Sequence, residues 1–82
     1  MQQIVRLPSQ LGAVVQSRRL AKGLTQTELA KLSSTQQKTV SAIENGSDGT
    51  RLDTLLRVIA ILDLDLQIAS RRQDDISIED VF

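Results

Sequence analysis

Hydrogen-bonding side chains crowd a short segment near the middle of the chain, between positions 36 and 41. Amide, hydroxyl and ammonium groups of this kind can donate to and accept from the base edges in the major groove of DNA. If the segment is a helix, its outward side carries Gln36, Gln37, Lys38, Thr39 and Ser41. The same residues also suit the solvated face of an ordinary helical bundle, so by themselves they leave both interpretations open.

The helix that would precede this segment is predicted to start after Thr25. Thr25 and Glu28 form a capping box, in which each side chain accepts a hydrogen bond from the other residue's backbone amide. The helix must be short, because the polar residues at 33 to 35 break the apolar pattern. Its predicted inward-facing residues are Leu29, Ala30 and Leu32.

The segment itself is predicted to be a second short helix. Its cap is either Ser34 together with Gln37 or Thr35 alone, and Gly46 ends it. Two short helices joined by a tight turn can place the second helix in a major groove. The predicted buried residues are Val40 and Ile43, which leaves positions 36, 37, 38, 41, 44 and 45 for solvent or DNA.

A further helix is predicted ahead of this pair, from Ser9 as its N-cap to Lys22, with Gly23 closing it. An apolar arm, QIVRL at 3 to 7, and Pro8 come before it. Cations crowd the last turn, where they suit the helix dipole. We interpret these cations as solvated or capping groups: Arg18, Arg19 and Lys22.

The last predicted helix begins at Thr50, which forms a capping-box-like pair with Asp53, and continues to about Asp63. Because one small core cannot bury so wide an apolar face, a partner surface is predicted for this helix. The apolar residues that cover more than half of its circumference are Leu52, Leu55, Leu56, Val58, Ile59, Ala60, Ile61 and Leu62.

The residue period changes after Asp63. Leu64, Leu66 and Ile68 alternate with Asp65, Gln67 and Ala69, which is the two-residue period of a β-strand. The QIVRL arm is the one other candidate strand, and an unpaired strand invites pairing with another chain. We therefore predict that this strand pairs with its own copy across a two-fold axis, giving a homodimer. The alternative is a strand that packs within its own chain.

Composition narrows the classes of function. Eighty-two residues make one domain, predicted at 1 to 71, followed by an acidic tail at 72 to 82. Without cysteine or histidine, disulfides, thiol chemistry and the usual zinc sites are excluded. The carboxylates are scattered and no Gly-rich phosphate loop occurs, so no catalytic residue, cofactor or metal is expected. No apolar run is long enough to span a bilayer and no signal-peptide pattern occurs, which predicts an intracellular protein.

Charge is distributed unevenly along a chain whose net charge is zero. Residues 1 to 51 hold seven Lys/Arg against three Asp/Glu, giving +4, whereas the last ten residues hold four acids and no base, giving −4. A basic head with an acidic tail can still bind phosphate. Plain disorder is the default for the tail, and docking into a partner's groove is the alternative for its apolar residues Ile78, Val81 and Phe82.

Two sequence blocks resemble a known family. These are L-T-Q-x-E-L-A at 24 to 30 and Q-x-T-V-S-x-I-E-N-G at 37 to 46. Over about residues 9 to 63 the chain is similar to helix-turn-helix regulators of the XRE type, which are related to phage Cro and lambda-type repressors. The P-S-Q-L-G opening at 8 to 12 and the D-L-D-L-Q-I strand resemble, more narrowly, antitoxins of the HipB type, the autorepressors partnered with HipA-type kinase toxins.

The resemblance implies a mainly α fold of four to five helices, lambda-repressor-like, with a short C-terminal strand for intersubunit pairing. It implies that Gln26 and Thr39 contact phosphates, and that Gln37 pairs with an adenine or bridges base and backbone. Lys38 and Ser41 would address further base edges, while Gln36 stands where the family often has Ser or Lys. The family's turn usually carries an apolar residue, Gly and another apolar residue, in place of Ser33, Ser34 and Thr35 here.

Three functions follow from the resemblance. The first is a homodimeric repressor that binds a palindromic operator in the bacterial cytoplasm, on the nucleoid, and is also the antitoxin of a HipA-like Ser/Thr kinase. The second is a stand-alone phage-type or metabolic regulator without a toxin partner. The third is a protein-interaction module that has kept the fold and lost DNA binding.

Overall fold

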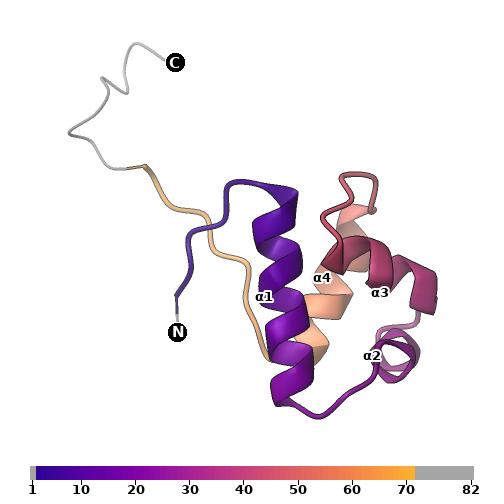
Figure 1. Cartoon of the computed structure of the whole chain (residues 1–82). Helices are drawn as coiled ribbons and strands as arrows, with labels where there is room; N and C mark the ends of the chain where they lie inside the picture. Colours follow the sequence, from indigo (N-terminus) through magenta and orange to yellow (C-terminus); the bar gives the residue numbers. More distant parts are fainter. Residues whose placement is uncertain (1, 72–82) are drawn as a thin grey trace.

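Four helices make up the part of the chain that the computed structural model describes, residues 2 to 71 (Figure 1). The predicted mainly α, helix-turn-helix architecture is confirmed, with α2 and α3 as its two short helices. The helices are α1 (Pro8–Ala21), α2 (Gln26–Leu32), α3 (Gln37–Glu44) and α4 (Leu52–Ile61). None of these helices is long and apolar enough to cross a membrane.

The start of α1 differs from the prediction, because Leu7 and not Ser9 is the N-cap. Pro8 occupies the first helical position, where its fixed φ suits the helix and its missing amide hydrogen costs nothing. The side chain of Gln10 closes the turn: its Oε1 accepts from the backbone amides of Arg6 at 2.6 Å and Leu7 at 3.0 Å. At the other end, Gly23 has a φ of 72° and follows the C-cap as predicted.

The capping box of α2 is confirmed. The Glu28 amide donates to the Thr25 hydroxyl at 3.0 Å, and the Thr25 amide donates to a Glu28 carboxylate oxygen at 2.8 Å. These two bonds satisfy backbone donors that the first turn of a helix leaves unpaired. The sequence therefore determines the beginning of α2 locally.

The predicted caps of α3 are wrong, because Gln36 is its N-cap and makes no capping hydrogen bond through its side chain. Ser34 and Thr35 belong to the turn instead. Ser34 has a φ of 57°, in the left-handed region, and the Thr35 amide donates to the Ala30 carbonyl at 2.9 Å. Ser33 is buried, and its hydroxyl donates to the Leu29 carbonyl at 2.7 Å. The turn is thus held by the buried Ser33 hydroxyl and by the backbone of Ser34 and Thr35.

The start of α4 also differs from the predicted pairing of Thr50 with Asp53. Arg51 is the N-cap. The Asp53 carboxylate accepts from the Thr54 amide at 2.7 Å and forms an exposed ion pair with Arg51 at 3.1 Å. A carboxylate in the first turn is favourable near the positive end of the helix dipole.

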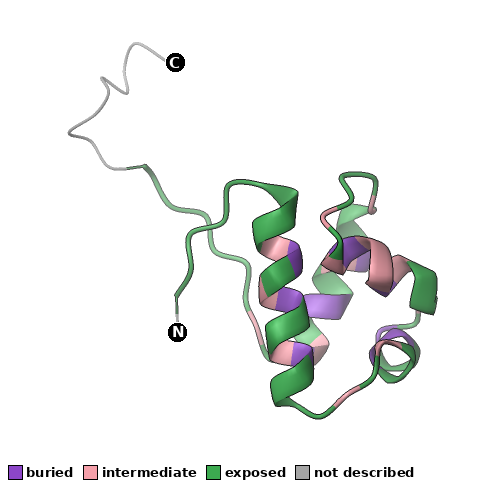
Figure 2. Ribbon diagram, in the orientation of Figure 1, coloured by how far each residue is buried: buried purple, intermediate pink, exposed green. Residues whose placement is uncertain are grey.

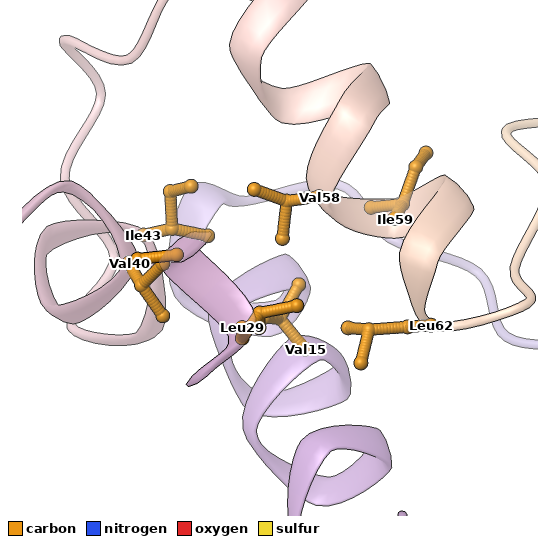
Figure 3. Close-up of a cluster of buried hydrophobic side chains, with 8 residues drawn as sticks. Val15, Leu29, Val40, Ile43, Val58, Ile59 and Leu62 are labelled. Atoms are coloured by element: carbon orange, nitrogen blue, oxygen red, sulfur yellow. The ribbon is translucent and has the colours of Figure 1, made fainter. Parts of the chain in front are cut away.

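Eight buried apolar side chains form the core where the four helices meet (Figures 2 and 3). Helix α1 contributes one of these residues and α2, α3 and α4 contribute two each, while Leu62 lies just after α4. Leu11, Leu24, Leu55, Ile61 and Leu64 are partly buried against the cluster. The core residues are Val15, Leu29, Ala30, Val40, Ile43, Val58, Ile59 and Leu62.

The α1 and α3 backbones approach each other closely at Gly12. A Cβ atom at this position would lie only 2.7 Å from the Glu44 carbonyl oxygen, and that backbone atom has no rotamer through which to move away. Gly12 is buried as a result of this crossing. The close approach brings the first turns of α1 alongside the end of α3.

One part of the predicted packing is wrong and another is confirmed. Leu32, predicted to face inward, is 56% exposed at the end of α2. On α4, Leu52, Leu56 and Ala60 are exposed and lie four residues apart, on one stripe of the helix. The expectation that α4 carries more apolar surface than one small core buries is therefore confirmed within residues 2 to 71.

The predicted C-terminal strand is not confirmed, because residues 2 to 71 contain no strand. Leu64 is half-buried against the chain's own core, whereas Leu66 is 53% and Ile68 is 95% exposed. Figure 1 shows this segment and the N-terminal arm on the side of α1 that lies away from α3. Pairing across a two-fold axis needs a second chain, so it stays a prediction, and the predicted docking residues Ile78, Val81 and Phe82 lie outside the described residues.

Candidate nucleic-acid interface

The first turn of α3 presents the polar side chains on which the sequence focused. Gln36, Gln37 and Lys38 are exposed, and Thr39 and Ser41 are half-buried. Ser41 Oγ lies 3.5 Å from the side-chain amide nitrogen of Asn45, at the outer limit of a hydrogen bond. The outward position predicted for residues 36 to 38 agrees with these exposures.

Gln26, on the neighbouring helix, lies next to Gln37. The Gln37 side chain donates from Nε2 to Oε1 of Gln26 at 2.6 Å. Gln26 is the first residue of α2 and Gln37 the first of α3, so the bond joins the two helices at their N-terminal ends. Both residues were predicted as DNA contacts from the sequence, and the structure brings them together.

Glu44 departs most from what the sequence predicted. It was assigned to the face left for solvent or DNA, but its side chain is only 2% exposed. Arg19 on α1 holds it through two hydrogen bonds, from Nε at 2.6 Å and from Nη2 at 3.0 Å. Arg19 also donates to the Leu24 carbonyl at 2.8 Å, and its hydrogen bond with Glu44 raises its pKa against the opposing effect of burial.

The interpretation of Arg19 as a solvated group is therefore wrong. The sequence did contain a pattern that indicates inward positions for both Arg19 and Glu44. Arg19 follows the buried Val15 by four positions, and Glu44 follows the buried Val40 by four. Residues at this spacing share a helix face. A cation and a carboxylate that both fall on inward faces are expected to pair, since an unpaired buried charge is costly.

The Glu44 carboxylate has one more partner. Its Oε1 accepts from Nε2 of Gln26 at 3.1 Å, so hydrogen bonds run without interruption from Arg19 to Gln37. No buried side-chain nitrogen or oxygen in the described part of the chain lacks a partner. The candidate interface thus has an exposed amide at its surface and a paired ionic group beneath it.

Three more cations hold the elements that support the interface. Arg57 on α4 donates from Nε to the Ser33 carbonyl at 3.0 Å, which ties the turn between α2 and α3 to α4. Arg18 donates from Nε to the Leu62 carbonyl at 2.9 Å, and Lys22 pairs with Asp63 at 2.6 Å. The hydrogen bond to Leu62 explains how a cation is accommodated at the half-buried position 18.

Comparison with known proteins places this geometry in a family. The helix-turn-helix family matches residues 15–68, more than half of the chain. The antitoxin HipB of Escherichia coli strain K12 is 34% identical over 65 residues, which are 79% of this chain and 74% of HipB.

Solved structures agree with the sequence match. A chain of the HipA-HipB-O2-O3 complex is similar with a TM-score of 0.79 at 32% identity, over 87% of this chain and 100% of that chain. The restriction-modification controller protein C.AhdI from Aeromonas hydrophila has a TM-score of 0.65 at 31% identity, over 71% of this chain and 84% of its own. The chain therefore belongs to the helix-turn-helix family of XRE-type regulators, and it is similar to the HipB antitoxin in both sequence and structure.

Proposed function

We propose that this chain is a sequence-specific, operator-binding repressor that is also the antitoxin of a HipA-type kinase and represses its own operon. The observation that carries the proposal is the hydrogen-bonded pair of Gln26 and Gln37 at the start of α2 and α3, with Gln37 exposed. This is where a helix-turn-helix protein meets the groove and the backbone of DNA. Similarity to HipB, including a HipB-O4 20mer complex at a TM-score of 0.79, supports the assignment.

In the proposed complex, α3 enters the major groove and α2 lies across it. Gln37 pairs with an adenine or bridges base and backbone, and a bidentate amide–adenine pair contributes roughly 1 to 3 kcal/mol of discrimination against other bases. Lys38 and Ser41 address further base edges, and Gln26 and Thr39 contact phosphates, which position the protein without reading sequence. Gln36 lies at the edge of this surface.

A homodimer would present two such surfaces to a palindromic operator. The exposed apolar stripe of α4 and the exposed Leu66 and Ile68 supply a face for a second copy, with the segment at 64 to 68 as the proposed pairing strand. Two α3 helices related by a two-fold axis would then lie one DNA turn apart, roughly 34 Å. Repression follows from occupation of the promoter in the bacterial cytoplasm.

The antitoxin role is supported by the similarity to HipB, which occurs together with HipA in a solved complex. In this role the protein would hold a HipA-like Ser/Thr kinase in a non-productive arrangement. We assign the docking to the acidic tail, with Ile78, Val81 and Phe82 as its apolar contacts. The weaker similarity to the controller C.AhdI, at a TM-score of 0.65, supports the alternative, a stand-alone regulator without a toxin partner.

The DNA-binding part is tested by Gln37→Ala. We expect a strong loss of affinity for the protein's own promoter in fluorescence anisotropy, with an unchanged oligomeric state. Gln16→Ala is the matched control, because it removes an exposed glutamine from α1, outside the proposed interface. Equal affinities of both variants and the unmodified protein would show that the reading helix is misassigned.

The antitoxin part is tested by copurification with the product of the neighbouring gene. A kinase that copurifies with the full chain, and no longer does so after deletion of residues 72 to 82, supports the docking tail. A kinase that is retained after the deletion removes the tail from the interface. If no kinase is encoded nearby and none copurifies, the stand-alone regulator is the better assignment.

A further inference from the structure

A continuous chain of hydrogen bonds joins the buried ion pair to the exposed Gln37. Arg19 holds both oxygens of Glu44, Glu44 accepts from Gln26 at 3.1 Å, and Gln26 accepts from Gln37 at 2.6 Å. Glu44 lies at the last turn of α3, whereas Gln37 lies at its first position. Gln26, from α2, bridges the distance between them.

The donor and acceptor groups fix the direction of every hydrogen bond in this series. An ionised carboxylate only accepts hydrogen bonds, so Gln26 must turn its NH₂ group toward Glu44 and its oxygen away from it. That oxygen then accepts from Gln37, which must turn its own NH₂ group inward. One hydrogen of the Gln37 amide is used in this way, and the second hydrogen and Oε1 are left for an external partner.

We propose that Glu44 is a positioning residue that sets the orientation of the Gln37 amide and thereby determines which base pair the protein prefers at the position Gln37 reads. This inference rests on the proposed function, because it presumes that Gln37 meets a base edge. The Glu44 side chain is buried, which keeps it from contacting DNA itself. Its effect on recognition passes entirely through Gln26.

The orientation matters because adenine presents two different groups side by side in the major groove. Its N7 accepts and its N6 amino group donates, so an amide matches it in one orientation and opposes it in the reverse one. The last torsion of a free glutamine side chain is broad and roughly two-fold, which lets the amide reverse at little cost. An amide fixed by Gln26 cannot adapt in this way, and it therefore rejects bases that present the opposite order.

The geometry of the ion pair explains why the group that orients Gln26 is a carboxylate held by an arginine. Two parallel bonds from a planar guanidinium fix the plane of the carboxylate, which a lysine would not do. A glutamine at position 44 would keep one oxygen and replace the other with an NH₂ group. Because Arg19 donates to both carboxylate oxygens, that NH₂ group would oppose an Arg19 N–H in either orientation, and position 44 would no longer hold the two glutamine amides in one orientation.

The experiment uses the full chain and a set of promoter duplexes in which single base pairs are exchanged. Gln37→Ala first identifies the position that Gln37 reads, as the base pair whose preference disappears. Glu44→Gln is then compared with Glu28→Gln, the same substitution in the capping box of α2, which lies outside the hydrogen-bond chain. Folding of each variant is confirmed by circular dichroism before the affinities are measured.

The expected result is position-specific. Glu44→Gln lowers the preference at the Gln37 position about tenfold or more and leaves the preferences at other positions unchanged. Glu28→Gln changes none of them. If Glu44→Gln reduces affinity equally for all duplexes and retains the preference at that position, the positioning role is overturned and only a structural role is left.

A second variant keeps the inference testable if Glu44→Gln does not fold. Gln26→Met removes the two middle hydrogen bonds of the series and leaves the ion pair of Arg19 with Glu44 intact. Methionine has a side-chain volume similar to that of glutamine. It should lose the same single preference, and a retained preference overturns the inference. An unmodified protein that shows no preference among the duplexes overturns the proposed function as well, which distinguishes the two failures.

Discussion

The polar and the apolar outer faces of this domain differ in how far their side chains are paired within the chain. On the face formed by α2 and α3, polar groups from three helices pair with one another, from Arg19 through Glu44 and Gln26 to Gln37. The apolar residues of α4 and of the segment that follows it are exposed instead within the described chain: Leu52, Leu56, Leu66 and Ile68.

The polar side chains of the first face are paired within one chain, whereas the apolar side chains of the second face need a partner molecule to cover them. The hydrogen bonds of the first face are satisfied within the chain, so its geometry does not depend on a partner. The second face leaves large apolar side chains in water, which is typical of an interaction surface. We therefore expect mutations on the first face to act on folding and recognition, and mutations on the second to act on association.

The largest expected effect is a loss of stability on removing the cation beneath the first face. Arg19→Met leaves the Glu44 carboxylate buried without its partner, and such a change costs about 3 to 5 kcal/mol of unfolding free energy. A domain of this size has a total of roughly 5 to 15 kcal/mol, so a large drop in the denaturant midpoint is expected at a fixed protein concentration.

Lys22→Met is the control for this substitution. It removes a cation from α1 and breaks the ion pair with Asp63, but that pair is exposed to solvent. Exposed pairs contribute little because water screens them. Equal midpoints for Arg19→Met and Lys22→Met would contradict the buried character of the first ion pair.

The second expected effect concerns association through the apolar side. Leu66→Asp places a charge in the proposed pairing strand, and we expect at least a tenfold weaker dimer by sedimentation. Leu32→Asp is the matched control, because Leu32 at the end of α2 is similarly exposed, at 56% against 53% for Leu66. A dimer that persists in the first variant, or that is lost equally in both, would refute strand pairing.

A smaller effect is expected in the turn between α2 and α3. Ser34 has a φ of 57°, which is unfavourable for a residue with a Cβ atom. Ser34→Gly should stabilise the domain by about 0.5 to 1 kcal/mol after the entropy of glycine in the unfolded chain is included. Ser47→Gly, at a residue outside the left-handed region, should give no gain in thermal unfolding.

The smallest effect is a pH dependence of the capping box. Hydrogen bonds from the Thr25 amide and then the Thr25 hydroxyl lower the pKa of Glu28 below its ordinary value of 4.5. Because the folded pKa is the lower one, this stabilisation is present above pH 4.5 and is lost as the pH falls through the folded value. The difference in melting temperature between the unmodified protein and Glu28→Gln should therefore shrink on acidification, and a growing difference would contradict the sign.

The sequence predicted those features that depend on neighbouring residues. The Thr25–Glu28 capping box, the glycines that follow α1 and α3, and the buried residues of α2 and α3 except Leu32 all follow from local patterns. The outward position of Gln36, Gln37 and Lys38 followed in the same way. These are features in which spacing alone determines which side of a helix a residue occupies.

The features that were missed depend on distant residues or on a backbone conformation that the residue type does not favour. Arg19 and Glu44 are 25 residues apart, so their pairing depends on how α1 crosses α3 at Gly12. Ser34 adopts a left-handed conformation that its residue type does not favour, because the turn requires it. Strand pairing at 64 to 68 requires a second chain and stays a prediction.

Direct competition between the protein's own promoter and a scrambled duplex of equal length and composition, at moderate ionic strength, tests whether the α3 face recognises sequence. We expect a preference of roughly 10³-fold or more for the promoter, as specific DNA-binding proteins show. Indistinguishable affinities for the two duplexes would contradict the regulator assignment.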